Sequence, residues 1–203
     1  MKTWFVAAMI VVIAAGGARA GSRPRIQVNG SLAIPLNPDG FTDGYILGFG
    51  GGIGAEIALS PSAKISGTVD FTTFDLDAGG YLASQKLAAP SSIVGGEVSV
   101  LYASGNLKWN VLLPSENILR PYVLLGAGYF RMATDDIVSP GSRIHRDTEH
   151  VFGAHGGAGI DIALGSAIGL FFDALYVFGI TDNESTGYLP VRVGLSFDLV
   201  PQL

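Results

Sequence analysis

The feature that most constrains this chain is an alternation of apolar with small or polar side chains that recurs in about eight segments. In its clearest form, over residues 45–59, apolar side chains alternate with a face made largely of glycine. A period of two residues is typical of a β-strand with one apolar face. Strands of soluble sheets average about five or six residues, whereas a tilted strand needs about nine to eleven to cross a membrane. The length of the segments therefore favours a barrel whose outer face meets lipid.

We predict one strand for each segment, with ends set by Gly, Pro, Asn, Asp and Ser. The predicted strands are residues 25–34, 45–59, 63–74, 94–111, 120–132, 150–164, 167–180 and 188–200. Short connections such as 60–62 and 165–166 alternate with longer polar ones such as 75–93 and 133–149. Short turns at one end and long loops at the other are typical of outer-membrane barrels, with the loops outside the cell. The expected fold is all-β, an eight-stranded antiparallel up-and-down transmembrane β-barrel.

Two of the predicted strands do not keep a simple phase. In the fourth, the polar residues before position 100 lie on one face of a regular strand, and those after position 105 lie on the opposite face. A bulge near residues 103–105 would bring them to the same face, so we predict one there. In the fifth, residues 122–130 are apolar on both faces, so the pattern does not say which face is inward. Aromatic residues near the ends of segments suit a girdle at the membrane interface. These are Tyr45, Trp109, Tyr122, Tyr129 and Tyr188.

The first twenty residues differ from the rest of the chain. Lys2 precedes an apolar run over residues 4–15, and Ala18 and Ala20 flank Arg19 in a small-residue triplet. A basic start, a short apolar run and an A-x-A site predict a secretory signal peptide in residues 1–20, cleaved after Ala20. The run is shorter than the ~18 residues that a spanning helix needs. We expect residues 21–203 to form a single outer-membrane β-barrel domain, because no linker or second compositional block follows.

Composition excludes several classes of function. The chain has no Cys, which rules out disulfides and lipoprotein processing on a cysteine. Its net charge is −5, and this argues against nucleic acid as a partner, because such binding depends on clustered Lys and Arg. Glycine is unusually frequent, with 29 residues, and inside a narrow barrel it makes room for larger side chains.

The polar faces of the strands carry charges of both signs. The expected lumen network, with a structural role, consists of Arg25, Glu56, Lys64, Asp70, His155, Asp161, Asp173, Arg192 and Asp198. The basic residues should pair with the acidic ones, because a buried carboxylate costs several kcal/mol unless it is paired. Eight strands enclose a space just wide enough for side chains. The sequence therefore predicts a plugged polar lumen.

Three histidines, His145, His150 and His155, resemble a metal-binding set at first sight. On a strand, however, the separation of five places His150 and His155 on opposite faces, and no Cys adds ligands. We expect no metal site and no cofactor.

A hydrolase triad is the remaining chemical alternative. It would combine His155 with Asp161 or Asp173 and with Ser66 or Ser196. Triads are recognised by their geometry, and no nucleophile motif surrounds either serine. Ion pairing inside a barrel accounts for the same residues, so we expect no catalytic residue.

Three segments carry a family resemblance. The stretches RPYVLLGAGYF from Arg120, GAHGGAGIDIAL from Gly153 and GLFFDALYVFG from Gly169 resemble the outer-membrane β-barrel domain family, the small eight-stranded barrels of OmpA-, OmpX-, OmpW- and opacity-like type. The resemblance implies a barrel in a Gram-negative outer membrane. The expected partners are outer-membrane lipids, lipopolysaccharide and the barrel-assembly machinery during insertion. Relatives usually end on an aromatic residue, whereas this chain ends on Leu203, in phase with Phe197.

The function expected from the sequence is that of a non-enzymatic integral outer-membrane barrel. It would have a structural or surface-interaction role and four extracellular loops. The alternatives are a lipid-acting outer-membrane barrel enzyme and a narrow channel for small solutes.

Overall fold

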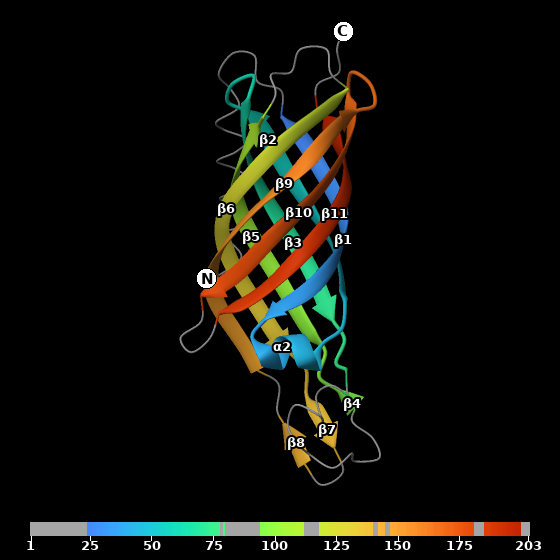
Figure 1. Ribbon diagram of the computed structural model, residues 1–203, viewed down its shortest axis with the longest axis vertical. Coiled ribbons are helices and arrows are strands. Elements are labelled where there is room, and N and C mark those ends of the chain that lie inside the picture. The colour runs from blue at the N-terminus through green and yellow to red at the C-terminus, as the bar shows by residue number, and fades with distance from the viewer. Residues whose placement is uncertain are drawn as a thin grey trace.

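The computed structural model describes residues 24–77, 79, 94–111, 118–139, 142–144, 147–180 and 185–199. Most of them form one closed antiparallel barrel, seen in Figure 1 as an upright cylinder of tilted strands. The barrel strands are β1 (Arg25–Asn37), β2 (Gly48–Ala58), β3 (Ala63–Phe74), β5 (Val98–Asn110), β6 (Leu119–Thr134), β9 (Asp147–Ala163), β10 (Ile168–Ile180) and β11 (Thr186–Asp198). Each pairs with the next along the chain, and β11 pairs with β1 to close the circle. The predicted fold class is confirmed.

The two ends of the barrel differ. At one end, here called the turn end, β2 and β3 are joined by a tight hairpin in which the amides of Leu59 and Ser60 donate to the carbonyl of Ala63 at 2.8 and 3.0 Å. The other end, here called the loop end, carries helix α2 (Asp39–Gly44) and a three-stranded sheet of β4 (Val94–Gly95), β7 (Ile137–Ser139) and β8 (Ser142–Ile144). These elements lie at the bottom of Figure 1.

Strand β2 shows how the alternation sets the two faces of the wall. Phe49 points outward and is 60% exposed, whereas Glu56 points inward and is 2% exposed. The inward positions between them are glycines, and a Cβ at Gly52 would collide with the carboxylate of Asp70 on the neighbouring strand. Glycine on β2 therefore leaves the interior to the larger side chains of β3.

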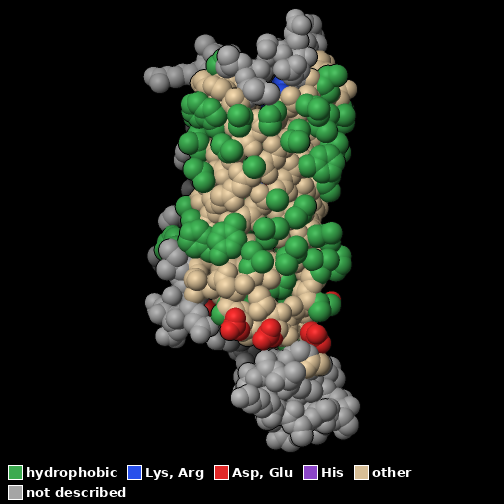
Figure 2. Space-filling model, in the orientation of Figure 1, with side chains coloured by type: hydrophobic (Ala, Val, Ile, Leu, Met, Phe, Trp, Pro, Cys, Tyr) green, Lys and Arg blue, Asp and Glu red, His purple; other side chains and the backbone are tan. Residues whose placement is uncertain are grey.

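The outer wall is apolar around the barrel. Its exposed large side chains include Val28, Leu32, Ile34, Ile53, Phe71, Leu107, Trp109, Val123, Leu125, Phe152, Phe172, Val191 and Val193. Figure 2 shows hydrophobic side chains over the height of the cylinder on one face, with carboxylates gathered below them. An exposed apolar surface of this extent marks contact with another apolar phase, and in a barrel wall that phase is lipid. Among the described residues, no helix has the length and apolar character that crossing a membrane requires.

The predicted bulge in the fourth strand is wrong. Strand β5 pairs with β3 and with β6 in continuous register, with no shift near residues 103–105. Its inward positions are apolar from Val98 to Tyr102 and polar from Ser104 to Asn110. The chemistry of the inward face changes along the strand while the phase stays constant. The two residues Val94 and Gly95, predicted as part of this strand, form β4 instead.

The fifth predicted strand, β6, is apolar on both faces because its inward side chains, like some of those on β5, are apolar. Tyr122, Leu124 and Phe130 are buried in the interior, whereas Val123 and Leu125 face outward. The girdle prediction is wrong for Tyr122 and Tyr188, because both are buried among interior residues.

Candidate functional site: the barrel interior

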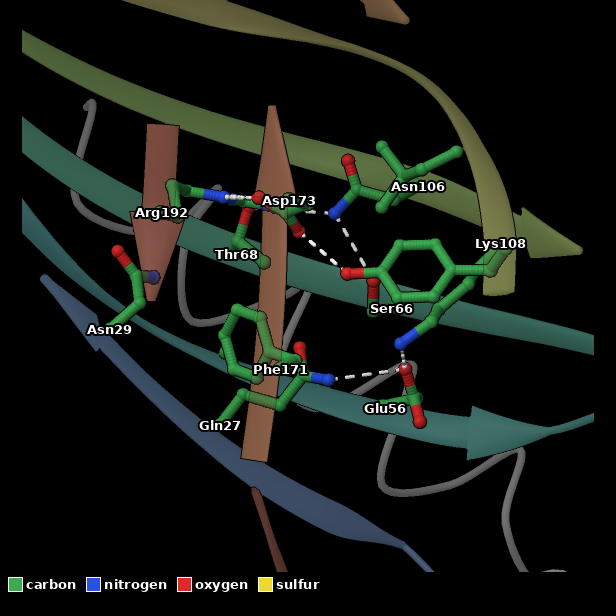
Figure 3. A pocket seen from close by; sticks show the side chains of 13 residues that line it. Gln27, Asn29, Glu56, Ser66, Thr68, Asn106, Lys108, Phe171, Asp173 and Arg192 are labelled. Carbon is green, nitrogen blue, oxygen red and sulfur yellow. Dashed lines mark hydrogen bonds and ion pairs between the residues drawn. The ribbon is translucent and has the colours of Figure 1, made fainter. Parts of the chain in front are cut away.

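A cluster of four charged side chains, one from each of four strands, lies in the turn-end half of the interior. Lys64 Nζ lies 2.8 Å from Glu56 Oε1 and 3.3 Å from Asp161 Oδ2. Lys108 Nζ lies 2.7 Å from Asp161 Oδ1 and 3.5 Å from Glu56 Oε2. Two cations thus alternate with two carboxylates, and the Gln27 amide donates to Glu56 at 3.1 Å. Figure 3 shows Lys108 and Gln27 reaching Glu56 from different strands.

A second charged group lies deeper in the barrel. Arg192 Nε is 2.7 Å from Asp173 Oδ1, and its Nη2 donates to Asp173 Oδ2 at 2.9 Å. The Tyr122 hydroxyl also donates to Asp173, at 2.8 Å. Asp70 completes the group, 3.7 Å from Arg192 Nη1, and accepts from the Asn29 amide at 3.1 Å. Every carboxylate in the group therefore has a donor, as burial requires.

The turn-end mouth opens into a cavity of about 430 Å³, here called the vestibule. Arg25 Nε and Asp198 Oδ1 lie 2.5 Å apart at its wall. Its lining residues include Arg25, Glu56, Lys64, Arg120, Asp161, Ser196 and Asp198. The vestibule ends against the charged cluster.

His155 occupies the boundary between the polar and apolar halves. It is buried, and its Nδ1 shares a hydrogen bond with the Tyr102 hydroxyl at 2.7 Å. Among the described residues no hydrogen bond joins His155 to Asp161, Asp173, Ser66 or Ser196. Ser66 instead accepts from the Asn106 amide at 3.1 Å. The residues of the alternative triad are not assembled.

The two histidines that the structure describes, His150 and His155, do not come together. His150 is exposed on the outer wall, whereas His155 is in the lumen. His145 lies outside the described residues. Within the described part of the chain, no group of three His, Cys, Asp or Glu side chains could hold a metal ion.

The loop-end half of the interior is filled by aromatic side chains. Phe74 meets Phe41 of α2 edge-on at 5.0 Å between ring centroids and Tyr188 at 5.7 Å. Tyr102 and Phe130 stack with their centroids 4.0 Å apart. We call these five residues the aromatic plug. The expectation of a polar lumen therefore holds for one half of the barrel and not for the half beside the loops.

Little space remains between the side chains of the interior. Two voids between the side chains of the described lumen measure about 10 and 20 Å³. A void needs about 10–15 Å³ by this measure to hold one water molecule. Each of these voids is therefore no larger than one or two water molecules need.

The structure places all nine residues of the expected lumen network on the inner face of the barrel and joins eight of them in ion pairs. Sequence reasoning missed Lys108, Tyr102 and Tyr122 as members of the same network. The alternation of β5 placed Lys108 in phase with Asn106, which was the available signal. The sequence contained no such signal for Tyr102 and Tyr122, because both lie in segments that are apolar on both faces.

Comparisons with known proteins agree with this architecture. A family model described as outer membrane protein beta-barrel domain matches residues 5–200. The solved structure of Neisserial surface protein A is similar, with 14% identity, coverage of 88% of this chain and 99% of that chain, and a TM-score of 0.60. The outer membrane protein OprG from Pseudomonas aeruginosa is also similar, with 13% identity, coverage of 90% of this chain and 98% of that chain, and a TM-score of 0.58.

A major outer membrane protein from Thermus thermophilus is also similar in structure, with 12% identity, coverage of 86% and 98%, and a TM-score of 0.53. A search of curated protein sequences found no match. At these identities the structural likenesses show the fold, and the family model covers most of the chain. The protein therefore belongs to the outer membrane protein beta-barrel domain family and is located in the cell outer membrane.

Proposed function

We propose that the protein is a non-enzymatic structural barrel that holds its extracellular loops on a closed, non-conducting scaffold. The observation that carries the proposal is the filled interior, in which the charged cluster and the aromatic plug occupy the described lumen between the vestibule and the loop end. Eight-stranded barrels have interiors that side chains can fill, whereas porins with 16–18 strands leave an aqueous channel.

Conductance in planar bilayers tests this proposal. We expect the refolded mature protein to show no sustained openings under conditions in which an open porin conducts. Steady openings of wild-type protein would contradict the plugged interior and favour the narrow channel. The porin, inserted in the same bilayers, controls for the sensitivity of the recording.

The absence of enzymatic activity is part of the proposal and has its own test. It is supported by the hydrogen bond that engages His155 with Tyr102 instead of a carboxylate. Outer-membrane lipids incubated with the protein should be unchanged by mass spectrometry. Any lipid product that disappears in the His155→Ala variant would overturn this part of the proposal.

Export through a signal peptide is also proposed. Residues 1–20 lie outside the described residues, and β1 starts at Arg25, shortly after the expected cleavage site. The intact mass of protein purified from outer membranes should correspond to a chain that begins at Gly21. A mass that includes Ala18 and Ala20 would contradict cleavage after Ala20.

The partners that we propose are outer-membrane lipids, lipopolysaccharide and, during insertion, the barrel-assembly machinery. The apolar outer wall supports lipid contact. Depletion of the assembly machinery should reduce the heat-modifiable, folded form of the protein on gels. Unchanged folding in depleted cells would contradict that partner.

A further inference from the structure

One basic side chain breaks the apolar character of the outer wall. Within the described barrel strands, Arg131 is the one Lys or Arg on the outward face. It is exposed and pairs across the strands with Leu101, which also faces outward. Neighbours directly opposite each other on adjacent strands share a face. The other basic residues of the barrel strands, Arg25, Lys64, Lys108, Arg120 and Arg192, are on the lumen face.

The depth of Arg131 in the membrane follows from its neighbours. Tyr129 lies two residues closer to the turn end on β6, and it pairs with Phe152 of β9, which is 73% exposed. Two residues along a strand correspond to about 6–7 Å. Outward aromatic residues mark the interface of a membrane barrel, so Arg131 lies beyond them at the level of the lipid headgroups. An outward Arg costs about 2–4 kcal/mol at the midplane of a bilayer but only about 0–1 near an interface.

A second nitrogen donor is fixed beside Arg131. His150 pairs directly with Arg131 across β6 and β9. Its ring stacks on Tyr129 with centroids 5.7 Å apart and an interplanar angle of 18°, and Tyr129 in turn meets Phe152 edge-on at 5.6 Å. The aromatic contacts orient the imidazole on the same outward face as the guanidinium.

No carboxylate from the described part of the chain is paired with this guanidinium. None of the ion pairs among the described residues includes Arg131. In the lumen, by contrast, Arg25, Lys64, Lys108 and Arg192 each pair with an acidic side chain. A guanidinium presents a planar fork of donors that matches the oxygens of a phosphate.

We propose that Arg131 and His150 form a binding site on the outer wall for a phosphate group of lipid A, the lipid anchor of lipopolysaccharide. The loop end faces outward in barrels with this arrangement of turns and loops, so the adjacent leaflet is the outer one. Tyr129 and Phe152 form an apolar surface beside the site that an acyl chain of the lipid can contact. A soluble phosphate has no acyl chain and would not make this contact. The site rests on the proposed contact with lipopolysaccharide, to which it gives a location, and it is independent of whether the barrel conducts.

Native mass spectrometry of the refolded mature protein with added diphosphoryl lipid A tests the site. We expect wild-type protein to retain the lipid and Arg131→Gln to bind it about tenfold more weakly, the effect of losing one charged hydrogen bond. Arg131→Lys, which keeps the charge but not the fork, should lie between them. His150→Gln should weaken binding by a smaller factor.

A matched control separates the site from general loss of charge. Arg120→Gln removes the same charge from the same strand on the lumen face, and it should bind lipid A as wild type does. Heat-modifiable migration on gels identifies variants that fail to fold. An Arg131 variant that fails to fold is replaced by Arg131→Met. The proposal is overturned if folded Arg131 variants retain lipid A as wild type does, if dephosphorylated lipid A binds equally well, or if phosphatidylglycerol competes equally.

Discussion

Arg192 and Asp173 face each other across the β10–β11 pair and form a two-pronged ion pair in the middle of the barrel. The two contacts, Nε to Oδ1 and Nη2 to Oδ2, measure 2.7 and 2.9 Å, and both side chains are buried. Tyr122, from β6, donates to the same carboxylate. The pair thus links neighbouring strands to a third strand across the lumen.

We expect Asp173→Leu to lower the free energy of unfolding by about 3–5 kcal/mol, because it leaves Arg192 buried without its main partner. Asp70, 3.7 Å from Arg192, should keep the loss near the lower end of that range. Urea titration of the protein in lipid vesicles measures the change. The double variant Asp173→Leu/Arg192→Leu should recover part of it, whereas a single variant as stable as wild type would show that the pair is not structural.

Gly126→Ala should destabilise the barrel by about 1–3 kcal/mol, the usual cost of overpacking an interior. A Cβ at Gly126 would collide with the ring of His155 and approach Asn106 Oδ1 to 2.6 Å. Gly105→Ala is the matched control, because a Cβ there meets nothing within 4 Å and Gly105 faces outward on the adjacent strand. Equal unfolding free energies for the two variants would contradict the packing around His155.

Tyr102→Phe should cost about 1–2 kcal/mol of stability, because it leaves Nδ1 of the buried His155 without its hydrogen bond. Stacking of the ring on Phe130 is retained in this variant. Tyr176→Phe removes a hydrogen bond to Asn37 at an exposed site and should cost less. Urea titration of both variants checks the order, and a larger loss for Tyr176→Phe would contradict it.

Phe74→Ala should be the most damaging single change in the aromatic plug, at about 3–5 kcal/mol. Phe74 is fully buried and touches both Phe41 and Tyr188. Thr73→Ala, at the neighbouring outward position, should change stability little. Thermal unfolding in detergent distinguishes them, and comparable midpoints would show that the plug contributes little.

The sequence predicted most of the fold because a strand has a fixed period. Residues 63–74 were predicted as a strand and form β3 over the same bounds. The prediction failed where both faces are apolar, on β5 near Tyr102 and on β6 near Tyr122. Alternation is informative only when the two faces meet chemically different surroundings. The loop-end half of the lumen is aromatic, so there the lipid face and the inner face look alike in sequence.

The interior was predictable in composition but not in its contacts. Charge segregation placed the nine network residues on one face, and their partners depend on which strands meet across the lumen. Lys64 and Asp161 are 97 positions apart in the chain and lie 3.3 Å apart in the barrel. Sequence spacing carries no information on such contacts, because the closure of the sheet sets them.

By itself, the sequence determined that this protein is a barrel with an apolar outside and a charged inside, because backbone geometry converts a two-residue period directly into two faces. Only the tertiary structure decided how the interior is divided. Closure at eight strands brings Phe41, Phe74 and Tyr188 together beside the loops and pairs Lys108 with Glu56 near the turns. The register of β6 against β9 places Arg131 and His150 side by side on the outer wall.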